Sequence, residues 1–140
     1  MEIISVPLQT VAGNQNVVFT DTVVGGKGCA THRIGSGLVS LRGSTNCQCR
    51  ARYKVFFSGN IAIPAGGTVA PIALAIAVDG EGMASTSMIQ TPAAAEQFAN
   101  VASGIFIDVP KGCCVQISVK NIGADPVDVQ NANLIVERVA

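Results

Sequence analysis

The sequence predicts an all-β protein, an antiparallel β-sandwich formed by a single domain of 140 residues. Apolar and polar residues alternate with a period of two along most of the chain, as in strands that place one face on a core and the other in solvent. Turn signals rich in glycine, proline and aspartate separate these segments at short intervals, which favours a sandwich or a barrel over alternating strands and helices. In chain order the turn signals are AGN, GGKG, GSG, PAGG, DGEG, PKG and GADP.

The part of the chain before residue 50 predicts short strands. Residues 1–14 form either an N-terminal arm or the first strand of a sheet. The expected strands in this part cover residues 2–6, 16–19, 29–34 and 37–41.

The longest alternating segment spans residues 51–63. Its odd-numbered residues, from Ala51 to Ile63, are apolar apart from Gly59, and the residues between them are mostly polar. We therefore expect the odd-numbered side chains to face the core. Arg50, Arg52 and Lys54 then share the outward face, where a charge row in solvent or against a subunit is expected and phosphate binding is the alternative.

The strand expected at residues 71–78 is apolar on both faces. Large residues on one face fill a core, whereas the small residues on the other face suit close approach by a neighbouring subunit or by a loop of the same chain. Charged residues make up only 13% of the chain and hydrophobic residues 49%, which leaves more apolar surface than a monomer usually exposes. The subunit contact is therefore preferred, and Ala75→Glu is expected to dissociate the oligomer. The small face comprises Pro71, Ala73, Ala75 and Ala77.

The rest of the chain predicts further strands and one short helix. Strands are expected at residues 83–89, 103–109, 115–120 and 132–136. The helix is expected in TPAAAEQF, where Thr91 is a suitable N-cap and Pro92 a suitable first helical residue.

The cysteines do not have the spacing of a metal site. The pairs Cys47–Cys49 and Cys113–Cys114 are separated by one and zero residues, unlike the knuckles of structural zinc sites. In an oxidising environment, a disulfide joining Cys47 or Cys49 to Cys113 or Cys114 is one interpretation. Buried, unreactive thiols are the alternative, since cysteine packs well as a small apolar residue.

No catalytic or cofactor site is expected. His32 is the only histidine, and because it lies three residues from Cys29, the two would face opposite sides of a strand, which disfavours a nucleophilic pair. Asp79 and Glu81 in DGEG fit a hairpin turn better than a calcium loop, and GGKG lacks the spacing of a phosphate-binding loop. We therefore expect a protein that is not an enzyme and uses neither a metal nor a cofactor.

The charge balance and the N-terminus exclude further classes of function. Nine basic and nine acidic residues cancel, which argues against a general nucleic-acid-binding protein. No apolar run reaches the length of a membrane-spanning helix. The N-terminal MEIISVPLQTVAG has neither the basic start nor the apolar run of a signal peptide, so synthesis and assembly in the cytoplasm are expected.

Three stretches resemble the trimeric jelly rolls of the tumour-necrosis-factor and complement globular-head class. The versions they are most similar to occur in phages of Firmicutes and in bacterial spore-surface glycoproteins. The resemblance implies a homotrimer of two-sheet jelly rolls over residues 15–140, although a collagen-like Gly-X-Y stalk is lacking. The three stretches are YKVFFSGNIAI, IALAIAVDGEGM and the segment from VPKG at Val109 to the final LIVERVA.

In a phage, this resemblance implies a structural virion protein that decorates the capsid. It would be made in the host cytoplasm, bind the major capsid protein and lie on the capsid exterior as a trimer. The alternative is a receptor-binding or glycan-binding head on a phage fibre or a spore surface. The expected trimer contacts are Phe56, Ala73, Ala75, Ala77 and Ile135.

Overall fold

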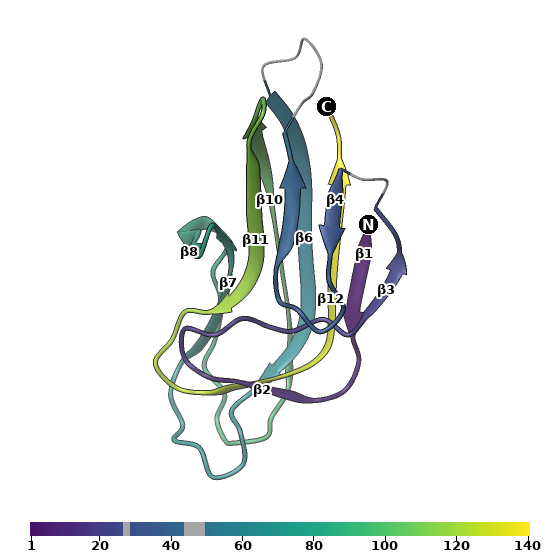
Figure 1. Cartoon of the computed structure of the whole chain (residues 1–140). Coiled ribbons are helices and arrows are strands. Elements are labelled where there is room, and N and C mark those ends of the chain that lie inside the picture. The colour runs from purple at the N-terminus through teal and green to yellow at the C-terminus, as the bar shows by residue number, and fades with distance from the viewer. Residues whose placement is uncertain (27–28, 44–49) are drawn as a thin grey trace.

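The computed structural model describes residues 1–26, 29–43 and 50–140, and these form two antiparallel sheets that face each other (Figure 1). Sheet A has six strands in the order β10-β6-β12-β1-β3, with β2 also paired to β12. Sheet B has six strands in the order β4-β5-β11-β7-β8, with β9 also paired to β7. This confirms the predicted all-β, antiparallel sandwich of the jelly-roll type.

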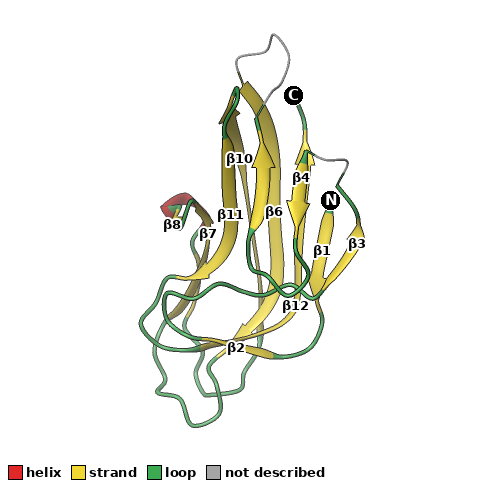
Figure 2. Cartoon of the chain, viewed as in Figure 1, coloured by secondary structure: helices red, strands yellow, loops and turns green. Residues whose placement is uncertain are grey.

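The strands of sheet A are β1 (Glu2–Ser5), β2 (Gln9–Val11), β3 (Asp21–Val24), β6 (Arg50–Ala62), β10 (Ala99–Pro110) and β12 (Val127–Arg138). Those of sheet B are β4 (Ala30–His32), β5 (Val39–Arg42), β7 (Ile72–Val78), β8 (Glu81–Gly82), β9 (Met88–Gln90) and β11 (Cys114–Asn121). A single turn of 3-10 helix, η1 (Ala84–Thr86), accompanies the strands in the described ranges (Figure 2). Within the described residues, no helix is long and apolar enough to cross a bilayer.

The alternation predicted for residues 51–63 is confirmed in β6. Tyr53, Val55 and Phe57 have no exposed surface, whereas Lys54 and Phe56 between them point outward. The register then extends this two-sided pattern to the neighbouring strands, because residues directly opposite each other in a sheet share a face. Val55, for example, lies opposite Ile105 on β10 and Val136 on β12.

The small face of β7 is covered by the same chain, and this corrects the predicted subunit contact at Ala75 and Ala77. Both alanines are completely buried within the subunit. Lys120 lies opposite Ala75 in the register, and its ammonium donates a hydrogen bond of 3.0 Å to the carbonyl of Gly80, which draws its side chain across this face. A Cβ placed on Gly82 would lie 3.8 Å from the Ala75 Cβ and 3.0 Å from Ile122 Cγ2, so these residues complete the cover.

The N-terminal residues are part of sheet A. β1 pairs with β12 from Glu2 opposite Ile135 to Ser5 opposite Ala132, and it pairs with β3 on its other side. The strand expected at residues 16–19 is reduced to a bridge between Asn16 and Lys120.

The helix expected between Thr91 and Phe98 is wrong. These residues form turns between β9 and β10. Glu96 has a φ of +64°, a left-handed conformation that a right-handed helix cannot contain, and its N–H donates a hydrogen bond of 2.8 Å to the carbonyl of Ile63. This contact with a distant loop overrides the local preference for helix.

Tyr53 places a hydrogen-bonded hydroxyl group in the core. Its hydroxyl lies 2.6 Å from the carbonyl oxygen of Arg42 and 2.9 Å from that of Cys29, and its one proton can be donated to either of them. Burial raises the pKa of the Tyr53 phenol, since the phenolate would have to lose its hydration.

Tyr53→Phe is expected to lower the free energy of unfolding by about 1 kcal/mol at neutral pH, because it removes a buried hydrogen bond. A pKa that is raised in the folded state gives stability below the unfolded value of about 10 and loses it as the pH rises further. The difference between wild type and variant should therefore shrink above that pH. Tyr53 is the only tyrosine, so denaturant titrations at two pH values compare the two chains without another phenol. An equal difference at both pH values would contradict the assignment.

Candidate functional site

The outward face of sheet A carries the sheet A patch, which consists of Phe56, Phe106 and Ile135. Their side chains are 37%, 62% and 39% exposed. Phe56 lies directly opposite Ile135 on β12, and Phe106 lies on β10 opposite Lys54, one row further along β6. Three large apolar side chains thus gather on the face that the alternation assigns to solvent.

Gly104 shapes this patch from β10. It lies opposite Phe56, and a Cβ placed on Gly104 would be 3.2 Å from Phe56 Cδ2, so the aromatic ring lies against the glycine backbone. Beside the ring is a hollow of about 380 Å³ lined by Lys54, Phe56, Ile135 and Glu137. The apolar surface is therefore indented, and a protruding side chain of a partner can enter it.

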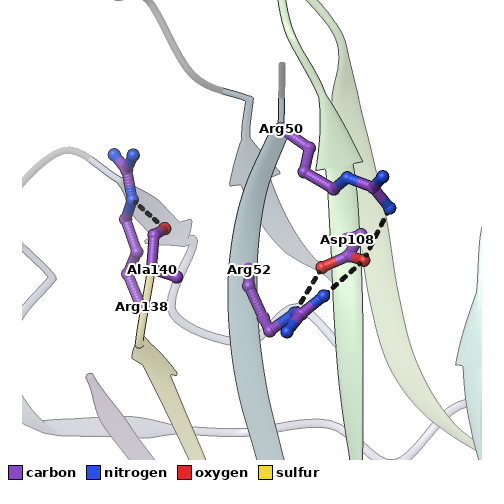
Figure 3. Close-up of polar contacts among 5 residues, drawn as sticks. All are labelled: Arg50, Arg52, Asp108, Arg138 and Ala140. Carbon is purple, nitrogen blue, oxygen red and sulfur yellow. Dashed lines mark hydrogen bonds and ion pairs between the residues drawn. The ribbon is translucent and has the colours of Figure 1, made fainter. Parts of the chain in front are cut away.

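An ionic cluster borders the patch toward the start of β6 (Figure 3). Arg52 donates from Nε to Asp108 Oδ1 at 2.8 Å and from Nη2 to Oδ2 at 3.2 Å, and Arg50 donates from Nη1 to Oδ2 at 3.2 Å. The Arg52 hydrogen bonds lower the pKa of the Asp108 carboxyl, and the same contact raises the pKa of Arg52. The pair is complete above the ordinary aspartate pKa of about 4 and is lost as the pH falls through the lower, folded-state value.

Polar groups also border the patch on its other sides. Asn133 Nδ2 donates a 2.5 Å hydrogen bond to the Glu2 carboxylate, and Lys54 and Glu137 lie opposite each other in the register. An apolar centre with a polar and charged rim is the usual anatomy of a protein–protein interface. The geometry can support association, and it places no nucleophile or acid–base pair at the patch.

Only two of the five predicted contact residues lie next to each other in the structure. Phe56 and Ile135 are adjacent in the patch, whereas the alanines of β7 lie in sheet B. Ala73 is half-buried on β7, apart from Phe56 and Ile135. Sequence reasoning missed Phe106, although a signal for it was present: Ile105 and Ile107 alternate inward on β10, which leaves the phenylalanine between them on the outward face.

The cysteines are divided between described and undescribed residues. Cys113 and Cys114 are exposed at the turn between β10 and β11, so the alternative of buried, unreactive thiols is wrong for these two. Cys47 and Cys49 lie outside the described residues. Gly43 and Arg50, the nearest described residues before and after Cys47 and Cys49, both lie at the turn between β10 and β11. Gly43 donates to the Cys113 carbonyl at 2.8 Å, and Arg50 lies opposite Pro110.

The disulfide between one of Cys47 and Cys49 and one of Cys113 and Cys114 stays a prediction. After oxidative purification, titration of the denatured chain should find three of the five thiols free, and all five after reduction. Cys29→Ser, which changes a cysteine outside the predicted pair, should lower both counts by one. Five free thiols in the unreduced wild type would contradict the disulfide.

His32 supports the hairpin between β4 and β5. Its Nε2 lies 2.8 Å from the carbonyl oxygen of Ser36, to which it donates as the Nε2–H tautomer, and its ring forms a T-shaped pair with that of Phe19, with 6.3 Å between centroids. Within the described ranges, no three His, Cys, Asp or Glu side chains are grouped as metal ligands.

No protein-family model and no curated protein sequence matches the chain. Among solved structures, the chain is similar to the globular domain of a zebrafish complement 1qA protein, with a TM-score of 0.61, 12% identity and coverage of 96% of this chain and 93% of that one. The sugar-binding EclA C-terminal domain has a TM-score of 0.43, 15% identity and coverage of 95% and 79%. A xylan-binding domain from Paenibacillus barcinonensis has a TM-score of 0.38, 16% identity and coverage of 94% and 95%. The first likeness supports the jelly-roll fold, which is shared by proteins of many functions.

Proposed function

We propose that the chain is a non-enzymatic structural protein that forms a homotrimer through the sheet A patch and decorates the exterior of a phage capsid. The observation that carries the proposal is the patch itself, because Phe56, Phe106 and Ile135 expose apolar surface on the outward face of the sandwich. Cyclic assembly would bury this surface in every subunit.

The composition supports the same proposal. Only 13% of the residues are charged, and the small face of β7 is covered by its own chain. The sheet A patch offers apolar surface that spans three neighbouring strands, β10, β6 and β12. Its polar rim would fix the orientation of the subunits, since charged rims contribute specificity more than affinity.

A decorating trimer needs a second surface for the capsid. Leu8 and Val18 are exposed and line one hollow, because Gln9 joins their two segments: its Nε2 donates to the Val18 carbonyl at 2.8 Å and its Oε1 accepts from the Val18 N–H at 2.9 Å. This surface lies around β2, separate from the sheet A patch, and it would stay accessible in the proposed trimer.

The test is binding to purified capsids that lack the protein. The proposal expects saturable binding with a fixed number of chains per capsid, measured by cosedimentation, and weaker binding by Leu8→Glu. The matched control is Ile89→Glu, which changes another exposed apolar residue in sheet B. Absence of capsid binding, together with binding to cells or a glycan array, would favour a receptor-binding or glycan-binding head.

A further inference from the structure

The outward face of sheet B contains a polar groove that assembly through sheet A leaves open. The groove has a volume of about 430 Å³, within the usual range of small-molecule sites. The sheet B groove is defined here by Thr31, Arg33, Leu38, Ser40 and Gln116, with Ser36 and His32 at its border.

Three polar side chains form its floor in one row across three strands. Thr31 on β4 lies opposite Ser40 on β5, and Ser40 lies opposite Gln116 on β11, so all three share the outward face at the spacing of neighbouring strands. None of the three side chains has a hydrogen-bond partner among the described residues. Each can both donate and accept, which is the capacity that hydroxyl groups of a ligand require.

The turn after β4 forms one side of the groove, and hydrogen bonds to His32 and to the backbone of Phe19 hold it in place. The Ser36 carbonyl accepts hydrogen bonds from His32 Nε2 at 2.8 Å and from the Phe19 N–H at 3.3 Å, and the Gly35 N–H donates to the Phe19 carbonyl at 2.9 Å. The Ser36 hydroxyl accepts from the Leu38 N–H at 3.0 Å. The turn that carries Arg33 is therefore anchored to the core, and little order has to be created when a ligand binds.

The charge of the groove is positive. Arg33 forms no ion pair in the described part of the chain, unlike Arg50 and Arg52, which pair with Asp108. The nearest carboxylate by register is that of Asp79, and its Oδ1 already accepts a 3.0 Å hydrogen bond from the Gln116 N–H. A free guanidinium beside a row of neutral polar groups suits a ligand that carries a carboxylate next to several hydroxyls.

We propose that the sheet B groove binds an acidic saccharide, with the sugar carboxylate on Arg33 and its hydroxyls on Thr31, Ser40 and Gln116. An added peptide strand is disfavoured, because β5 is paired with β4 on one side and β11 on the other and has no free backbone edge. Leu38, which is 39% exposed, offers an apolar contact for the ring of the sugar.

The test is an NMR titration of the ¹⁵N-labelled chain with digalacturonate. We expect saturable shifts in the amides of residues 31–40 and of Gln116. The neutral comparison is galactobiose, which lacks the carboxylates and should bind about tenfold more weakly or not at all. Arg33→Gln should weaken digalacturonate binding by about tenfold or more, and Ser40→Ala should weaken it several-fold.

The matched control is Arg42→Gln, because Arg42 is another exposed arginine on the same face of β5 and lies outside the groove. Binding equal to wild type in this variant and reduced binding in Arg33→Gln support the proposal. Absence of shifts, equal binding of galactobiose, undiminished binding by Arg33→Gln, or identical shifts with sodium sulfate at equal concentration would overturn it. The oligomeric mass of each variant, measured on the same samples, separates this result from the assembly proposal.

Discussion

Replacing Ala75 by glutamate is expected to unfold the subunit instead of separating folded subunits. Ala75 is completely buried on β7, with Lys120 opposite it and Gly82 nearby on β8. A carboxylate at this position would lose its hydration in a space filled around a methyl group, and the Lys120 ammonium, which donates to the Gly80 carbonyl, would have to move to pair with it. Burying the charge costs several kcal/mol, and the added volume costs about 1–3 kcal/mol more. Since a domain has a total stability of about 5–15 kcal/mol, most of it would be lost.

Circular dichroism during thermal unfolding, with light scattering on the same sample, measures this effect. The matched control is Ala73→Glu, since Ala73 belongs to the same row of β7 but is only half-buried and should be less destabilised. A folded, monomeric Ala75→Glu chain with the melting temperature of the wild type would contradict the claim that the same chain covers Ala75. It would favour the earlier prediction that Ala75 contacts a second subunit.

Changing Phe56 and Ile135 together to glutamate is expected to turn the oligomer into folded monomers. In the free subunit both side chains reach solvent, at 37% and 39% exposure, so the two carboxylates can stay hydrated there. In the proposed interface they would be desolvated at its apolar centre, where truncation of a central residue typically costs 2 kcal/mol or more. Two such positions weaken association by about a thousandfold.

Sedimentation velocity over a range of concentrations gives the mass of this variant, and circular dichroism verifies its fold. Val23→Glu is the control, because Val23 is 57% exposed on β3 of the same sheet but lies outside the sheet A patch. If the double variant kept the mass of the Val23→Glu chain, or if the wild type were a monomer, assembly through the patch would be excluded.

The strands and their inward rows were predictable from the sequence, because alternation is a local property with a period of two. Tyr53, Val55 and Phe57 on β6, and Leu134 and Val136 on β12, are buried as the pattern predicts. Residues of the candidate site were partly predictable in the same way. An apolar residue on an outward row, such as Phe56 or Ile135, already departs from the expected pattern.

Contacts between distant segments could not be predicted from this pattern. Nothing in the spacing of β7 distinguishes a face covered by Lys120 and Gly82 from a face covered by a second subunit, since both require small apolar residues. The turns after Thr91 likewise depend on a hydrogen bond between Glu96 and Ile63, which a local helix preference does not include.

The sequence by itself determined the all-β class, the inward rows of the strands and the absence of net charge, because these follow from composition and from neighbours one or two residues apart. The tertiary structure decided which outward residues meet. Phe56, Phe106 and Ile135 share one patch, and Thr31, Ser40 and Gln116 share one groove, through the register of strands far apart in the chain. A shift of one residue in any of these pairings would turn the side chains to the other face. The candidate sites therefore depend on the strand register, which is set only when distant strands pair.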